Sequence, residues 1–133
     1  MTSVVMTWQA AGTFGWGILG LNIFCQWAVD PDLTPLMIAP ISPNDLRWLD
    51  PLRASIVRAA VATSNEFAAK VGRTQPHETL RMDCPVIHGL GNGFAPTRFL
   101  GTSNIGRLIF EDTRLAGFEA KVGRYDVLLV AST

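Results

Sequence analysis

The chain has 133 residues, of which 48% are hydrophobic and 17% are charged, and its eleven Lys and Arg residues balance eleven Asp and Glu residues. This length suits one domain with a buried core, and the apolar content excludes an intrinsically disordered chain. Because the net charge is zero, no overall electrostatic attraction to nucleic acid or to anionic lipid is expected. Two cysteines are too few for a disulfide scaffold and favour a reduced, cytoplasmic compartment.

The N-terminal segment carries no charge from residue 2 to residue 29. Such a run is long enough to span a bilayer, but its glycines and polar side chains, and the absence of Lys or Arg before Arg47, argue against a spanning helix and against a signal peptide. The pattern favours a buried strand over 3–8, followed by small residues and a buried helix over 18–28.

The middle of the chain predicts a second apolar strand at 35–40, bracketed by prolines. Ser42 followed by Pro43 is typical of a helix start. A long helix is expected over 52–71, with Gly72 as its cap. Its buried face is predicted to comprise Ile56, Ala59, Ala60, Thr63, Phe67 and Val71.

The last third predicts a polar exposed loop over 73–83 and then alternating elements. Strands are expected at 84–88 and 104–110, a short helix at 116–122 and a final strand at 126–130. Apolar strands that alternate with helices favour the α/β class, as a Rossmann-like three-layer sandwich with a mostly parallel sheet of about five strands. Ligands bind such sheets beyond the carboxyl ends of the strands.

The segment from Gly15 to Gly20 matches the G-x-G-x-x-G pattern and opens a predicted helix. Glycines there allow a phosphate to approach the free N–H groups of a helix N-terminus. The alternative is that these glycines only allow the helix to pack on the sheet. A nicotinamide dinucleotide is disfavoured, because the glycines begin several residues after the first strand and no carboxylate ends the second.

Two further candidates lie at predicted strand ends. His88 could donate a hydrogen bond to a sugar or act as a general acid or base, and a structural histidine is the equal alternative. Glu111 could orient an acceptor hydroxyl, or it could serve with Asp112 to cap the following helix. The Cys and His spacings match no zinc site, and no metal is expected.

Four short segments carry a family resemblance: residues 13–17, 20–22, 104–115 and 125–133. Together they resemble the N-terminal domain of bacterial glycosyltransferases of the GT-B architecture, in the group of glycogen-synthase-like and mannosyl transferases. The resemblance implies transfer of a sugar from a nucleotide-sugar donor to a hydroxyl of a glycan or small-molecule acceptor. The nucleotide-sugar is then a co-substrate, and no other cofactor is implied.

The resemblance also implies roles for individual residues. The loop and helix start with Gly15, Trp16, Gly17 and Gly20 would contact the donor diphosphate. His88 and Glu111 would lie on the catalytic, acceptor-facing side of the cleft.

In that family a donor-binding C-terminal domain follows, and it is absent from residues 1–133. We therefore expect 1–133 to be a single Rossmann-like, acceptor-side domain with little or no transferase activity alone. A fragment, a truncated product and a half that pairs with another chain stay open. Further alternatives are a non-catalytic binding or assembly module and, less favoured, a nicotinamide oxidoreductase. A partner domain, a second copy of the chain and a peripheral membrane contact stay open as partners.

Overall fold

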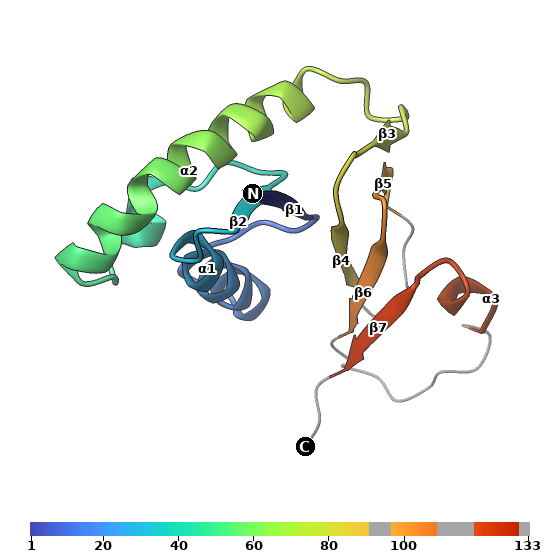
Figure 1. Ribbon diagram of the computed structural model, residues 1–133, viewed down its shortest axis with the longest axis horizontal. Coiled ribbons are helices and arrows are strands. Elements are labelled where there is room, and N and C mark those ends of the chain that lie inside the picture. Colours follow the sequence, from blue (N-terminus) through green and yellow to red (C-terminus); the bar gives the residue numbers. More distant parts are fainter. Residues whose placement is uncertain (91–96, 109–118, 131–133) are drawn as a thin grey trace.

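The computed structural model describes residues 1–90, 97–108 and 119–130. Among these residues, five strands form one parallel sheet in the order β2-β1-β4-β6-β7 (Figure 1). The strands are β1 (Thr2–Met6), β2 (Leu33–Met37), β4 (Val86–Leu90), β6 (Asn104–Leu108) and β7 (Val127–Val130). Short apolar runs suit such strands, because a parallel sheet is covered on both faces. The predicted α/β class and parallel sheet are confirmed.

Two long helices follow the first two strands of the sheet. α1 (Gly15–Ala28) connects β1 to β2, and α2 (Pro51–Gly72) connects β2 to the second half of the chain. α2 begins one residue before the predicted start at 52: the Asp50 side chain accepts a hydrogen bond from Arg53 N at 3.0 Å, and Pro51 takes the first helical position. The expected start at Ser42 is a capping box on the short 3₁₀ helix η1 (Pro43–Leu46).

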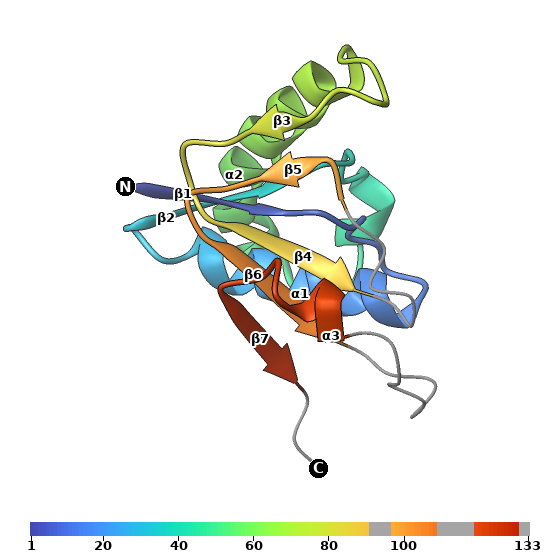
Figure 2. The same ribbon diagram turned by 90° about the vertical axis from the view of Figure 1, so that its right-hand side faces the viewer.

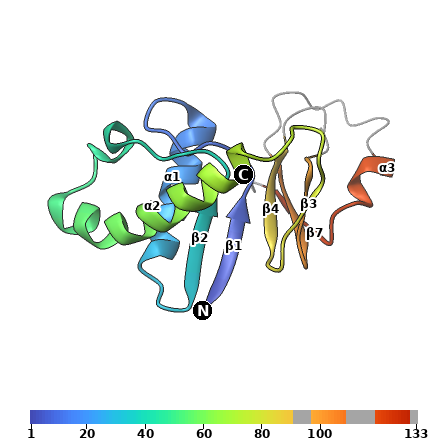
Figure 3. The same cartoon turned by 90° about the horizontal axis from the view of Figure 1, so that it is seen from above.

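The two faces of the sheet pack against different elements, which makes the three-layer arrangement (Figure 3). On one face, α1 and the first half of α2 cover one set of alternate strand residues, among them Val4, Met6, Met37 and Ile87. On the other face, the end of α2 and β5 (Phe99–Leu100) cover Val5, Leu36 and Val86. Val122 at the end of the short helix α3 (Glu119–Val122), with Tyr125 and Leu128, joins Leu90 and Leu108 on that second face.

Two short strands pair beside the main sheet. β3 (Leu80–Arg81) runs parallel to β5. The region 73–83, predicted as an exposed loop, therefore contains a strand. Two-residue strands carry no periodic pattern, so local sequence does not reveal them.

The predicted bounds need correction at several elements. α1 begins at Gly15, three residues before the predicted start, and the third strand extends to Leu90 instead of ending at His88. Gly72 is the last residue of α2, and the cap is Arg73, whose backbone stays in the right-handed helical region.

The predicted buried face of α2 is largely wrong. Ile56, Ala59 and Thr63 are exposed. The buried residues lie about one position further along the helix: Val57, Val61, Ser64, Ala68 and Val71. Because alanines line much of this helix, apolar spacing alone does not select a face. The buried side carries Val57 and Val61, which join the core, and Ser64, whose hydroxyl accepts a hydrogen bond from Met37 N at 2.9 Å.

Within the described ranges, no helix has the length and apolar character that crossing a membrane requires.

Candidate functional site

The order in which strands are added to the parallel sheet reverses between β1 and β4. The chain places β2 on one side of β1, and then β4, β6 and β7 on the other. In open α/β sheets, ligands bind at such a reversal, beyond the carboxyl ends of the strands. Figure 2 shows the start of α1 and η1 lying together at the ends toward which the strands point.

The residues at this reversal hold β1 and β4 together. Thr7 N donates to the Ile87 carbonyl at 3.0 Å, and the Thr7 hydroxyl accepts from Gly89 N at 3.1 Å. Both bonds satisfy backbone groups just where regular pairing ends. These two bonds thus fix β1 and β4 relative to one another at the base of the candidate site.

Trp8 fills the space above this edge and positions α1. A Cβ built on Gly89 would lie 3.0 Å from Trp8 Cε3, and one on Gly20 would lie 2.6 Å from Trp8 Nε1. The indole N–H donates to the Trp16 carbonyl at 2.9 Å, and the two indoles meet edge to face. Trp8 was expected only as the end of the first strand, over 3–8, but β1 ends at Met6 and Trp8 belongs to the site.

The three glycines of the fingerprint have different surroundings. A Cβ on Gly17 would lie 2.7 Å from Ala11 Cβ, and Gly20 is closed off by Trp8, so both glycines allow close packing. A Cβ on Gly15 would meet no atom within 4 Å. Close packing thus explains Gly17 and Gly20 but not Gly15.

The N-cap residue of α1 gives its first turn no side-chain cap. Phe14 occupies the N-cap position without a side-chain hydrogen bond, and no acidic residue lies in the first turn. The N–H groups of a first turn lack intrahelical partners and carry a partial positive charge. Trp16 is half-buried here, while Gly15 is exposed.

The loop before α1 is tied to the loop after β2. Gly12 N donates to Asp45 Oδ1 at 3.1 Å, and the Trp48 indole lies directly against Gly12. Partial burial raises the pKa of Asp45, but hydrogen bonds from the Ser42 hydroxyl and from the Gly12 and Ser42 N–H groups outweigh it and lower the pKa below its usual value. The carboxylate of Asp45 therefore joins the loop before α1 to the loop after β2.

His88 lies inside β4 and is 3% exposed. Asn104 Oδ1 can only accept, so His88 Nε2–H donates to it at 3.0 Å, and Nδ1 accepts from the Thr97 hydroxyl at 2.6 Å. Burial lowers the pKa of His88, and the hydrogen bond to Asn104 raises it only in part. The ring is thus neutral at neutral pH and has both nitrogens paired.

The structure does not bring His88 and the start of α1 together. Ile87 packs into the core on the α1 side, so the next side chain, His88, points to the opposite face, where its ring meets Tyr125 edge to face. It borders a cavity of about 120 Å³ on that face. Glu111, the other predicted catalytic residue, lies outside the described residues. The catalytic roles of His88 and Glu111 stay predictions.

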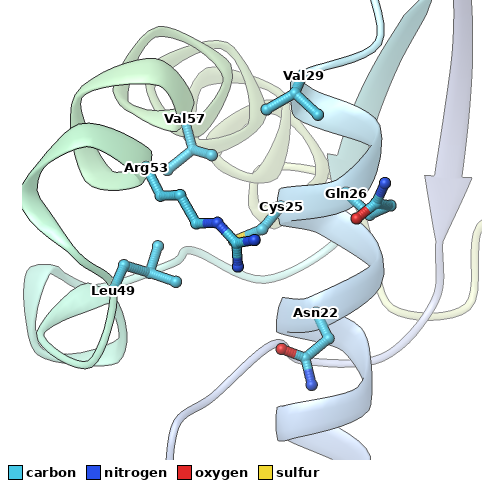
Figure 4. A pocket seen from close by; sticks show the side chains of 7 residues that line it. All are labelled: Asn22, Cys25, Gln26, Val29, Leu49, Arg53 and Val57. Carbon is cyan, nitrogen blue, oxygen red and sulfur yellow. The ribbon is translucent and has the colours of Figure 1, made fainter.

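A larger cavity of about 400 Å³ lies along α1 and α2, away from the strand ends. Figure 4 shows Arg53 reaching from α2 across this groove toward Cys25 of α1. Burial raises the pKa of the Cys25 thiol, and the Arg53 charge offsets only part of that rise. Cys25 and Cys84 are both free thiols. In the described part of the chain, no three His, Cys, Asp or Glu residues are grouped to hold a metal ion.

Comparison of the chain with protein-family models, with curated proteins and with solved structures found no match.

Proposed function

We propose that the chain is the acceptor-side Rossmann-like half of a glycosyltransferase, which moves a sugar from a nucleotide-sugar donor to an acceptor hydroxyl. In this proposal the first turn of α1 contacts the donor diphosphate. The acceptor binds at the carboxyl ends of β1 and β4. The short-motif resemblance supports this assignment together with the position of α1 at the reversal of the sheet.

Gly15 is the observation that carries the proposal. Unlike Gly17 and Gly20, it has open space where a side chain would stand, and it is the first residue of a helix whose N-cap residue, Phe14, makes no side-chain hydrogen bond. Only a bare backbone lets a diphosphate reach first-turn N–H groups closely. Packing of the protein does not account for glycine at this position, whereas anion binding does.

The test is binding of UDP-glucose and GDP-mannose to the chain, followed by calorimetry and by amide shifts of residues 15–20. We expect binding without appreciable sugar transfer. In Gly15→Glu, a carboxylate roughly 6 Å from the two diphosphate charges in water costs about 1.4 kcal/mol, or about tenfold in affinity. The same carboxylate stabilises the helix start by about 0.3–1 kcal/mol, so lost binding cannot be ascribed to unfolding.

Two matched variants separate charge from position. Gly15→Gln adds the same bulk without the charge, and we expect a smaller loss. Gly72→Glu adds the same charge at another glycine with open space around it, at the far end of α2, and we expect no change. Equal affinity of the wild type and Gly15→Glu would contradict the proposal, as would measurable sugar transfer by the chain alone.

A second candidate is a binding or assembly module of the same fold without chemistry. The pairing of both His88 ring nitrogens inside the protein favours it, because a general acid or base must reach its substrate. Substitution of His88 by Gln distinguishes the two functions. A change in sugar-dependent binding favours the transferase, and a change in stability alone favours the module.

A further inference from the structure

Arg107 of β6 carries a guanidinium group that finds no partner in the described parts of the chain. Its Nε is the one buried side-chain nitrogen or oxygen there that lacks a hydrogen-bond partner. Arg107 also forms no ion pair with a described residue. Residue 107 as a whole is half-buried. Hiding an unpaired donor of a charged group from water destabilises a protein unless an anion compensates the charge.

Arg98 shows how the same fold satisfies a half-buried arginine in a structural role. Its Nη1 donates to the carbonyl oxygens of Gln75 and Glu78 at 2.7 and 3.4 Å, and its Nη2 donates to that of Val71 at 3.4 Å. Arg107 lies in the same range of exposure, and no described carbonyl accepts from its buried Nε. The difference indicates that the partner of Arg107 comes from outside the chain.

The register of the sheet places Arg107 on the face that α1 covers. Ile105 packs against the core on that face, and side chains two residues apart on a strand share a face. Arg107 pairs with Gly89 of β4, about 4.8 Å away on the neighbouring strand. Trp8, which also binds the first turn of α1, lies against Gly89. Arg107 is therefore on the same face as the start of α1, whereas His88 points to the opposite face.

Arg107 is also accessible at the edge of the sheet where ligands bind. It is the last residue but one of β6, so it stands near the carboxyl end of that strand. Its neighbour on β7, Leu129, lies on the α1 face and is 41% exposed, and Val127 on the same face is 50% exposed. A solute can therefore approach the guanidinium group from this side.

We propose that Arg107 binds an anionic group of the acceptor, either a phosphate or a carboxylate. This role rests on the proposed function, in which the acceptor lies at the carboxyl ends of β1 and β4, because β6 is the next strand of the sheet. A guanidinium binds either group through paired N–H donors, and the anion compensates the charge that the fold leaves unpaired. The acceptor is then a small anionic sugar, held by its charge while the donor diphosphate binds the first turn of α1.

The test is calorimetric titration of the full chain with glucose 6-phosphate, glucuronate and glucose, which share a sugar ring and differ in charge. We expect an anionic sugar to bind about tenfold or more tightly than glucose, with an affinity that decreases as salt increases. Tighter binding of glucose 6-phosphate assigns a phosphate to Arg107, and tighter binding of glucuronate assigns a carboxylate.

Arg107→Met keeps the length of the apolar stem and removes the charge. It is expected to lower the affinity for the anionic sugar about tenfold or more and to leave the affinity for UDP-glucose unchanged. Arg107→Lys keeps a charge without the paired donors and should retain part of the affinity. The matched control is Arg81→Met, which removes an exposed arginine of β3 outside the main sheet and should change neither affinity.

Urea denaturation without ligand separates binding from a structural role. Arg107→Met should unfold at a higher urea concentration than the wild type, because the unpaired buried donor is gone. An arginine that served only the fold would give a lower midpoint.

Failure of both anionic sugars to bind overturns the proposal, as does equal affinity of the wild type and Arg107→Met. Weaker UDP-glucose binding in Arg107→Met, with the affinity for the anionic sugar unchanged, would assign Arg107 to the donor instead. Failure of the proposed donor site gives a different result. UDP-glucose then does not bind, while the anionic sugar still binds through Arg107.

Discussion

Replacing each glycine of the α1 start with alanine tests whether the close contacts at Gly17 and Gly20 are real constraints of the fold. Alanine at Gly17 would place its Cβ 2.7 Å from Ala11 Cβ and 2.9 Å from Ala11 N. The Ala11 N–H donates to the Gly17 carbonyl at 3.0 Å, so the loop cannot retreat without losing that bond. At Gly20 the obstacle is the Trp8 indole, which is held by its hydrogen bond to the Trp16 carbonyl.

The expected change in the free energy of unfolding is the cost of overpacking minus the gain in helix propensity. Overpacking a closed site costs about 1–3 kcal/mol. Alanine regains up to about 1 kcal/mol over glycine inside a helix. We therefore expect Gly17→Ala and Gly20→Ala to lower the free energy of unfolding by about 1–2 kcal/mol. Gly15→Ala meets no atom, and we expect it to be neutral or to stabilise by up to about 1 kcal/mol.

Urea denaturation followed by circular dichroism measures the three differences on one scale. The order is the decisive result: Gly15→Ala should be the most stable of the three variants. If Gly17→Ala or Gly20→Ala were as stable as Gly15→Ala, the close approach of α1 to Trp8 and Ala11 would be wrong. The explanation of two of the three fingerprint glycines would fail with it.

Two other predictions concern buried polar groups. Ser64→Ala leaves the buried Met37 N–H unpaired and should cost about 1–3 kcal/mol in urea denaturation, whereas the exposed Thr63→Ala should change stability by less than about 0.5 kcal/mol. Since burial lowers the folded-state pKa of His88, the unfolded chain binds the proton first, and the free energy of unfolding should decrease as the pH falls below about 6.5. His88→Gln should reduce that decrease, and an unchanged slope in His88→Gln would contradict the assignment.

The main sheet was predictable because each of its strands is a short apolar run with a turn residue nearby. The start of α2 was predicted at 52, one residue after its first residue Pro51, and the Asp50 cap was not predicted. The buried side of α2 was not predictable in this way. Its alanines fit either face, and the buried face is the one that makes contacts with residues distant in sequence, through Val57 and Val61 in the core and the Ser64–Met37 bond.

The candidate site was predictable only in part. The glycine segment was identified, but its pattern could not separate Gly15 from Gly17 and Gly20, because the difference lies in what Trp8 and Ala11 occupy. His88 was expected at a strand end. The strand extends two residues beyond it, and alternation then directs the ring to the face opposite α1. Shifts of one or two residues in a strand decide which face a side chain reaches.

The loop before α1 depends on the loop after β2. Gly12 is bound by Asp45 and covered by Trp48, so the two loops are joined at one residue. The first turn of α1, where the diphosphate is proposed to bind, begins three residues after Gly12. Asp45→Asn should weaken the Gly12 bond and so reduce nucleotide binding measured by calorimetry, although residue 45 makes no proposed contact with the nucleotide. Unchanged nucleotide affinity in Asp45→Asn would contradict this coupling between the two loops.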